Sequence, residues 1–227
     1  MEALLLQDLY KIYKEGDIET VALREARLKV QPGEFVAITG RSGAGKSTLL
    51  HIIGGLTEPS AGRVVIDGTD IARLSERDRA AFRGERIGIV FQADNLIPFL
   101  SALENVMLPM QLVRRKDAAA RARSLLAEVG LSERMRHKPA MLSGGERQRA
   151  AIAAALANEP KLLLADELTG ELDSATADHM MELLANLNIN HGLTLVIVTH
   201  NKAVAARARR QVRIADGQLF ESEAAHA

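Results

Sequence analysis

Residues 35–48 read FVAITGRSGAGKST and contain the most informative pattern in the chain. The run at 35–39 is short and apolar, the loop at 40–47 matches G-x-x-x-x-G-K-[ST] in full, and helical character begins at 46. In such a loop the backbone N–H groups surround phosphate oxygens, because glycine carries no Cβ to obstruct them. The pattern predicts a strand, a phosphate-binding loop and a helix, in that order.

Two side chains of this loop carry charge and metal chemistry. Lys46 supplies a positive charge to the β- and γ-phosphates of a nucleotide, and the Ser47 hydroxyl can ligate Mg²⁺. The helix that begins there aims its positive end at the same phosphates. A glycine-rich turn with a solvated lysine is the alternative, which the position between strand and helix disfavours. The predicted nucleotide-binding residues are Gly40, Arg41, Ser42, Gly43, Ala44, Gly45, Lys46, Ser47 and Thr48.

The rest of the chain alternates strand-like and helical runs. Strands are predicted at 21–30, 62–68, 86–91, 162–165, 194–199 and 211–219, and helices at 46–54, 75–83, 116–129, 144–157 and 175–188. Apolar strands alternating with helices are typical of an α/β fold whose mostly parallel sheet is covered on both faces. We interpret residues 95–158 as a helical subdomain inserted into a core of residues 1–92 and 160–220, with a tail at 221–227.

The composition excludes several classes of protein. The chain has 227 residues, enough for one large domain, and its 29 Lys and Arg balance 29 Asp and Glu. A neutral chain is not expected to coat nucleic acid, which favours a basic excess. No apolar run approaches the ~18 residues that span a bilayer, the first residues lack a signal-peptide pattern, and cysteine is absent. We expect a cytoplasmic protein without disulfides or thiolate metal sites.

Two adjacent carboxylates, Asp166 and Glu167, follow the predicted strand at 162–165. In an enzyme with a phosphate-binding loop, an acid at this strand end holds Mg²⁺ directly or through water, which assigns that role to Asp166. Glu167 would polarise the attacking water as a general base. Such a pair alone more often caps a helix, but together with the loop at 40–47 it favours catalysis.

A third segment, LSGGERQR at 142–149, heads an Ala-rich helical run. Ser143 and Glu146 form the capping-box pattern S-x-x-E, which is a purely structural explanation. Two glycines in the first turn of a helix nevertheless cost roughly 1 kcal/mol each relative to alanine. That cost is explained if the bare helix terminus must approach an anion closely.

With these three segments in order, nearly the whole chain resembles the ATP-binding cassette (ABC) family. The resemblance implies a P-loop NTPase fold with a RecA-like, mostly parallel core, an antiparallel β subdomain and an inserted α-helical subdomain. LSGGERQR resembles the signature sequence of the family. By this resemblance Ser143, Gly144 and Gly145 bind the γ-phosphate of ATP held by the opposite subunit of a head-to-tail homodimer.

The resemblance extends to four single residues. Gln92 matches the Q-loop glutamine that contacts Mg²⁺ and water, and His200 matches the switch histidine that contacts the γ-phosphate. Asp173 matches the D-loop aspartate at the dimer interface. Tyr13 matches the aromatic residue that stacks on adenine, although Tyr10 is close enough to be the alternative. ATP and Mg²⁺ are the implied cofactors, with Glu167, His200, Lys46 and Gln92 in catalysis and Ser47, Gln92 and Asp166 at the metal.

Two residues depart from the commoner family pattern. Leu168 stands where proline is usual, which restores a backbone N–H just after the proposed base. Glu171 stands where asparagine is usual and adds a carboxylate near the dimer interface. Neither change removes a catalytic group, so we expect an active ATPase whose rate these changes affect.

The stretches 94–110 and 162–170 are similar to a bacterial subgroup that drives lipoprotein release, macrolide and peptide export, and cell-division complexes. The partner implied is a separate FtsX-like, MacB-type permease with four membrane helices, with the ATPase on the inner face of the cell membrane. A polar amino-acid importer is the alternative. A DNA-repair or translation ATPase is disfavoured by the single uninterrupted cassette, and a non-hydrolysing regulator by Glu167 and His200.

The apolar segment 95–112 is a candidate docking site for the permease. Pro98, Phe99 and Pro109 are expected to prevent one continuous buried helix there. Packing inside the helical subdomain explains part of its apolar character. The functional interpretation is a groove, with a rim at Leu96 to Leu100, that accepts a short cytoplasmic helix of the permease.

Overall fold

A sheet of six strands carries the predicted phosphate-binding loop. The computed structural model describes residues 2–93, 95–170 and 172–221, and within them the strand order of this sheet is β10-β9-β3-β8-β7-β6. Its strands are parallel except β10, which runs antiparallel to β9. The bounds are β3 Phe35–Thr39, β6 Ile87–Val90, β7 Leu162–Asp166, β8 Thr194–Thr199, β9 Arg210–Ala215 and β10 Gln218–Glu221. The expected mostly parallel sheet is confirmed.

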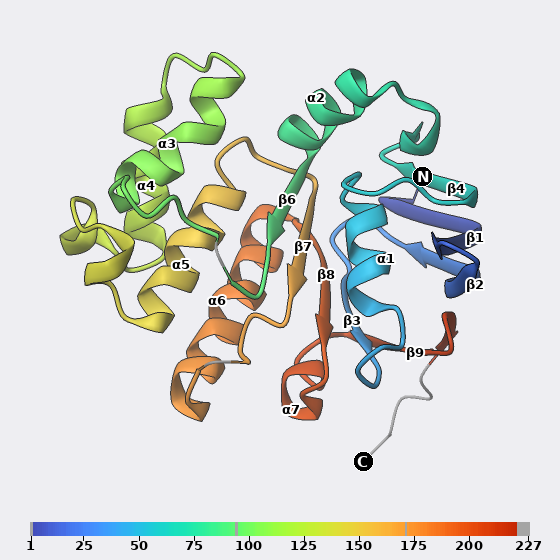
Figure 1. The fold of residues 1–227 in the computed structure, drawn as a ribbon. Coiled ribbons are helices and arrows are strands. Elements are labelled where there is room, and N and C mark those ends of the chain that lie inside the picture. The colour runs from blue at the N-terminus through green and yellow to red at the C-terminus, as the bar shows by residue number, and fades with distance from the viewer. Residues whose placement is uncertain (1, 94, 171, 222–227) are drawn as a thin grey trace.

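A second sheet is antiparallel and has the order β2-β1-β4-β5 in the described residues. Its strands are β1 Leu4–Glu15, β2 Ile18–Val30, β4 Ala61–Ile66 and β5 Thr69–Asp70. The predicted strand at 21–30 is therefore the second half of a longer hairpin. Figure 1 shows this sheet beside α1 (Lys46–Ile53), on the opposite side of the molecule from α3, α4 and α5.

Helices cover the parallel sheet, and a further group packs at one side. The helix α6 (Ser174–His191) and the short α7 (Lys202–Ala205) follow β7 and β8, whereas α2 (Glu76–Arg86) precedes β6. The group at the side, called the helical group below, contains α3 (Ala102–Leu112), α4 (Ala118–Glu128) and α5 (Gly144–Ala155). Short 3₁₀ turns lie at Ser132–Arg134 and Pro139–Met141, between α4 and α5, and at Ile71–Arg73, before α2. None of the described helices is both long and apolar enough to span a bilayer.

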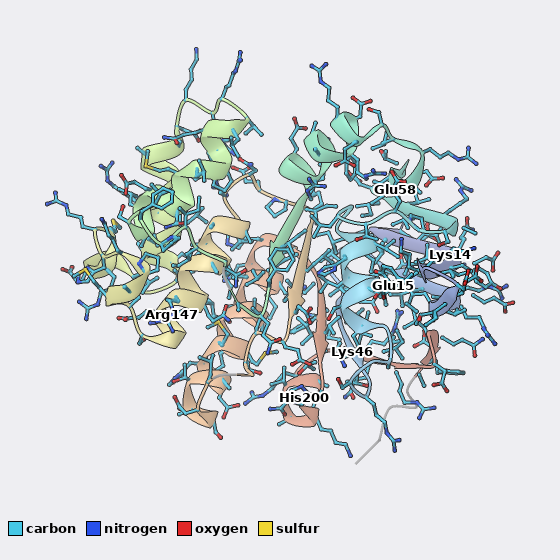
Figure 2. All side chains as sticks on the ribbon, viewed as in Figure 1. Lys14, Glu15, Lys46, Glu58, Arg147 and His200 are labelled. Carbon is cyan, nitrogen blue, oxygen red and sulfur yellow. The ribbon has the colours of Figure 1, made fainter. Side chains whose placement is uncertain are left out.

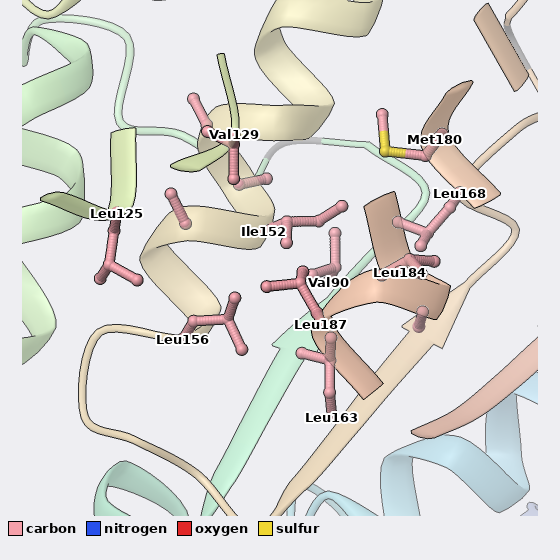
Figure 3. Close-up of a cluster of buried hydrophobic side chains, with 14 of the residues drawn as sticks. Val90, Leu125, Val129, Ile152, Leu156, Leu163, Leu168, Met180, Leu184 and Leu187 are labelled. Carbon is pink, nitrogen blue, oxygen red and sulfur yellow. The ribbon is translucent and has the colours of Figure 1, made fainter. Parts of the chain in front are cut away.

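The two faces of the parallel sheet belong to different hydrophobic clusters. Leu163 and Ile197 face a cluster shared with α5, α6 and the helical group, part of which Figure 3 shows. Leu164 and Val196 face the other cluster, which contains α1 and the antiparallel sheet. Successive side chains of a strand point to opposite faces, so apolar runs such as 194–199 supply both clusters at once. Both faces are thus buried, as the sequence predicted.

The segment 95–112 is not one continuous helix, as expected, but Pro109 does not interrupt its helical part, contrary to expectation. The helix α3 runs continuously through Pro109, although proline cannot donate the i→i−4 hydrogen bond. Its start is fixed by a capping box between Ser101 and Glu104, and Asn158 Nδ2 donates to the carbonyl oxygen of Pro109 over 3.1 Å. Pro98 and Phe99 lie in the non-helical segment before α3. The tail proposed at 221–227 lies outside the described residues, apart from Glu221, which ends β10.

Candidate functional site

The predicted catalytic residues gather at one edge of the parallel sheet. The strands β3, β8 and β7 are adjacent, and their carboxyl ends lead to the phosphate-binding loop, His200 and Glu167 respectively. Carboxyl ends of parallel strands lie at the same edge, where ligands of α/β proteins bind. Figure 2 shows Lys46 and His200 at this edge.

The ammonium group of Lys46 lies inside the loop that precedes it. Its Nζ donates to the carbonyl oxygens of Gly40 and Arg41, both over 3.0 Å, and the residue is only 8% exposed. The lysine begins α1, so its charge and the positive end of the helix point at the same space. The loop can therefore hold phosphate oxygens between the ammonium group and backbone N–H groups.

The glycines of the loop have a packing role that the sequence interpretation missed. A Cβ on Gly40 would lie 2.6 Å from the carbonyl oxygen of Ile214, and one on Gly45 would lie 2.5 Å from that of Ala22. Gly45 also has a φ of 101°, which side chains rarely adopt. These two glycines let the loop lie directly against β9 and β2, so the position of the cradle depends on distant strands.

Ser47 and Asp166 bring a hydroxyl oxygen and a carboxylate together beside the phosphate-binding loop. Asp166 ends the buried strand β7, and burial is the main effect that raises its pKa. A hydrogen bond from Ser47 opposes this rise, and the negative charge of Glu167 adds to it. Within the described residues, no three His, Asp or Glu side chains are grouped to hold a metal. A hydroxyl and a carboxylate nevertheless fit Mg²⁺, which takes its other ligands from phosphates and water.

Glu167 and His200 form a direct pair beside this site. The Nδ1 atom of His200 lies 2.8 Å from Glu167 Oε1, with the histidine 63% and the glutamate 18% exposed. Glu167 adopts a φ of 45°, a conformation uncommon outside glycine, and its N–H donates to the carbonyl oxygen of Val198 over 2.9 Å. The carboxylate is thus held by its neighbours at the sheet edge, where it can accept a proton from water.

Leu168, the residue in place of the usual proline, is buried. Its side chain packs in the cluster that contains Met180 and Leu184, as Figure 3 shows. The substitution therefore anchors the backbone after Glu167 through apolar packing. Glu171, the other departure from the family pattern, lies outside the described residues.

Gln92 follows β6 and lies near the carboxylate pair. A Cβ built on Gly170 would lie 3.8 Å from Gln92 Nε2 and 4.0 Å from Glu167 Oε2, so both side chains face the same turn. The carbonyl oxygen of Gln92 accepts a hydrogen bond from Gln148 Nε2 over 3.3 Å. Gln148 lies on α5, and its contact was not predicted because the two residues are 56 positions apart. The Gln92 segment therefore joins the sheet edge to the helical group.

The predicted signature segment begins α5 with the expected capping box. Ser143 Oγ accepts the N–H of Glu146, and Glu146 Oε2 accepts the N–H of Ser143 over 2.8 Å. Gly144 and Gly145 form the first turn. Figure 2 shows Arg147 of this turn well apart from Lys46 and His200. The structure does not bring Ser143, Gly144 and Gly145 together with the phosphate-binding loop of the same chain.

Asp173 and the two tyrosines make local contacts, and none of the contacts found in the described residues joins them to Lys46. Asp173 is the N-cap of α6 and accepts hydrogen bonds from Thr176. Tyr13 is 42% exposed on β1, with the Lys11 ammonium 4.9 Å from its ring centroid. The hydroxyl of Tyr10 instead donates to Glu25 over 2.8 Å.

Comparisons with known proteins identify the family of the chain. The ABC transporter family model matches residues 23–170. The lipoprotein-releasing system ATP-binding protein LolD of Geobacter metallireducens is 50% identical over 222 residues, which cover 96% of this chain and 99% of LolD. The macrolide export ATP-binding/permease protein MacB of Syntrophobacter fumaroxidans is 47% identical over 96% of this chain, which corresponds to 31% of MacB.

Solved structures give the same fold. The dimeric, post-hydrolysis structure of the ATP-binding cassette MJ0796, bound to ADP and Pi, has a TM-score of 0.90 and is 42% identical, with 97% of each chain covered. A second dimeric structure of MJ0796, a bacterial ABC transporter cassette, also has a TM-score of 0.90, at 43% identity.

Proposed function

Because the chain belongs to the ABC transporter family, we propose that it powers a separate membrane permease by closing head to tail with a second copy around two ATP molecules. One observation carries this proposal. The phosphate-binding loop and the α5 terminus are each suited to bind phosphate, yet they lie apart in one chain. A second copy can place its α5 terminus over the first copy's loop. The dimeric MJ0796 cassette with ADP and Pi supports the arrangement.

The sheet edge supports the following catalytic roles. Lys46 binds the β- and γ-phosphates, and Glu167 takes a proton from the attacking water. His200, 2.8 Å from Glu167, orients that carboxylate and contacts the γ-phosphate. Ser47, Asp166 and Gln92 would hold Mg²⁺, which neutralises phosphate charge when bound. In the opposite subunit, Ser143, Gly144, Gly145 and Asp173 close over the nucleotide.

Adenine stacking is assigned to Tyr13. Its ring is exposed, and no hydrogen bond to its hydroxyl is found within the described residues. The hydroxyl of Tyr10, by contrast, donates a hydrogen bond to Glu25. Base–aromatic stacking contributes roughly 1–3 kcal/mol and tolerates different bases. Tyr13 is thus suited to strengthen nucleotide binding without selecting adenine strongly.

The partner we propose is an FtsX- or MacB-like permease, with the ATPase at the inner face of the cell membrane. LolD is named for lipoprotein release, and MacB for macrolide export with a permease in the same protein. Similarity at 50% and 47% identity to proteins of these names favours export, lipoprotein release or mechanical work over import.

The helical group offers a surface for that permease. A cavity of about 720 Å³ lies between α2, β6 and the α3–α5 face, lined by apolar side chains that include Ile87, Ile89, Leu108, Leu112 and Ala151. A second cavity of about 550 Å³ is lined by Gln92, Leu96 and Pro98. Asn95 lines both, and it binds the N–H and the carbonyl oxygen of Phe91 over 2.7 and 2.6 Å.

We call the two cavities together the docking groove. Because Asn95 lines both of them, a helix docked there can act on the segment that carries Gln92. We propose that the permease helix lies along residues 96–112, and that closure of the ATP dimer moves the helical group against the sheet. The apolar lining suits the helix-in-groove mode, in which one apolar helix face supplies the affinity.

The decisive experiment removes the base and keeps the geometry. The variant Glu167→Gln should form a stable dimer with Mg-ATP in a sedimentation measurement, with almost no phosphate release. The unaltered protein should release phosphate continuously, which a non-hydrolysing regulator would not do. Near-normal turnover of Glu167→Gln would exclude Glu167 as the base.

A further inference from the structure

Thr176, on the first turn of α6, makes two bonds to Asp173. Its backbone N–H donates to Asp173 Oδ1 over 3.0 Å, and its hydroxyl donates to Asp173 Oδ2 over 2.6 Å. The hydroxyl bond and the backbone bond lower the pKa of Asp173. Both oxygens of an exposed carboxylate are thereby fixed at the start of the helix.

The methyl group of the same side chain lies against the signature segment. A Cβ built on Gly145 would lie 2.7 Å from Thr176 Cγ2, closer than real Cβ contacts occur. A Cβ on Gly144 would lie 3.6 Å from Leu172 Cδ2, which is ordinary contact. Gly145 is also buried, although it lies in the first turn of α5. Thr176 therefore requires glycine at 145 within one subunit, independently of any nucleotide.

Thr176 contacts two segments, at Asp173 and at Gly145, that are about thirty positions apart in sequence. Both segments belong to the proposed dimer interface. In the head-to-tail dimer, both Asp173 and the α5 terminus face the nucleotide held by the other subunit. One side chain bonds to the first segment through its hydroxyl and packs on the second through its methyl. A change in the position of either segment is therefore passed to the other.

We propose that Thr176 is a positioning residue for ATP hydrolysis, which holds Asp173 and Gly145 as one unit against the nucleotide of the opposite subunit. The inference rests on the proposed head-to-tail dimer. Thr176 acts through these two residues, so its loss should change turnover while leaving the phosphate-binding loop of its own chain intact.

Two substitutions separate the contacts. Thr176→Val keeps the methyl group and removes the hydroxyl, whereas Thr176→Ser keeps the hydroxyl and removes the methyl. The backbone bond to Asp173 remains in both. We expect Thr176→Val to lower kcat about three- to tenfold, the scale of the net contribution of one typical hydrogen bond. Thr176→Ser should be intermediate. The ATP affinity of the isolated subunit, measured by calorimetry, should not change in either variant. Ser174 is exposed beside Thr176, so Ser174→Ala serves as the control.

Linked dimers distinguish positioning from simple stability. A linked dimer with Lys46→Ala in one half has one competent nucleotide site, formed by the loop of the normal half and the signature segment of the Lys46→Ala half. Thr176→Val should lower turnover when it is in the Lys46→Ala half and have little effect in the other half. Equal losses in both placements would overturn the proposal.

A second test does not depend on turnover. Gly145→Ala places a Cβ against the Thr176 methyl, so it should lower the unfolding temperature. Gly145→Ala combined with Thr176→Ser removes that methyl and should recover most of the loss, whereas Gly145→Ala with Ser174→Ala should not. Absence of recovery would refute the contact. Recovery of stability without any ATP-driven dimer would instead point to failure of the proposed function.

Discussion

At the scale of single residues, Lys46 is the buried charge on which we propose that nucleotide binding depends. Lys46→Ala deletes an ammonium group enclosed by loop carbonyl oxygens, so we expect ATP affinity to fall at least about tenfold and turnover to be lost. Calorimetry with ATP on the folded variant measures the first effect. Lys116→Ala removes the same charge from an exposed position and should bind ATP normally. Unchanged affinity in Lys46→Ala would refute its assignment as the phosphate lysine.

The buried carboxylate of Asp166 is expected to lower the stability of the folded protein when it is ionised. Burial raises its pKa above the unfolded-state value, so the folded protein binds this proton more tightly and the ionised side chain is destabilising at higher pH. Without nucleotide or Mg²⁺, Asp166→Asn should raise the unfolding temperature at neutral pH, because a neutral amide avoids the cost of burying a charge. Thermal unfolding followed by circular dichroism measures it.

The pH dependence gives this prediction its sign. The advantage of Asp166→Asn should be largest above the folded-state pKa of Asp166, and it should shrink as the pH falls toward the unfolded-state value. Asp17 is exposed, so Asp17→Asn should show no such gain in unfolding temperature. A gain that grows as the pH falls would contradict the role of burial.

At the scale of elements, the segment 96–112 carries exposed apolar side chains at both of its ends. Phe99 is 70% and Leu112 76% exposed, so neither is needed for the fold. Phe99→Asp should leave the subunit folded with its basal ATPase, while co-purification with the permease and stimulation by it fall at least about tenfold. Leu112→Asp should have the same effect, because Leu112 lines the larger cavity.

An equally exposed residue elsewhere provides the control. Ile189 on α6 is 65% exposed and lies outside both the segment 96–112 and the two cavities, so Ile189→Asp should leave the complex intact. An intact complex with Phe99→Asp would place docking away from residues 96–100. Unfolding of Phe99→Asp would show that the residue belongs to the core.

Elements were predicted well where the local sequence determines them. The strand at 194–199 is apolar between its two terminal threonines and lies buried as β8, and the S-x-x-E pattern at Ser143 caps α5 as expected. Pro109 was misjudged, because the packing of α3 against its neighbours outweighs the missing backbone bond. Tertiary contacts of this kind leave no local pattern.

At the scale of the whole molecule, dimer formation should appear in the unfolding temperature. Ligands and partners that bind only the folded state stabilise it by mass action. With Mg-ATP, the unfolding temperature of Glu167→Gln should rise with protein concentration, because each ATP is bound by two chains. Adding Lys46→Ala should abolish this dependence, as measured by scanning calorimetry across a range of protein concentrations. A concentration-independent value for Glu167→Gln would contradict the dimer.

The candidate site divides into a predictable part and an unpredictable part. The loop at 40–47 and the adjacent carboxylates Asp166 and Glu167 are contiguous in sequence, so their chemistry could be proposed from the sequence alone. The Glu167–His200 pair could be expected only from adjacent parallel strands. The contact between Thr176 and Gly145 could not be predicted, because the residues lie on separate helices and each has a sufficient local explanation as a helix start.

The place of β3 in the sheet has a consequence for synthesis of the protein on the ribosome. Its neighbours are β8 and β9, so within the described part of the chain residues 35–39 pair only with residues 195–199 and 210–213. Chains elongate at roughly 5–20 residues per second, and such long-range pairs form late. The nascent chain must therefore carry an unpaired, apolar strand for most of its translation. We expect its early folding to depend on chaperones, and ATP to bind only to chains that are almost complete.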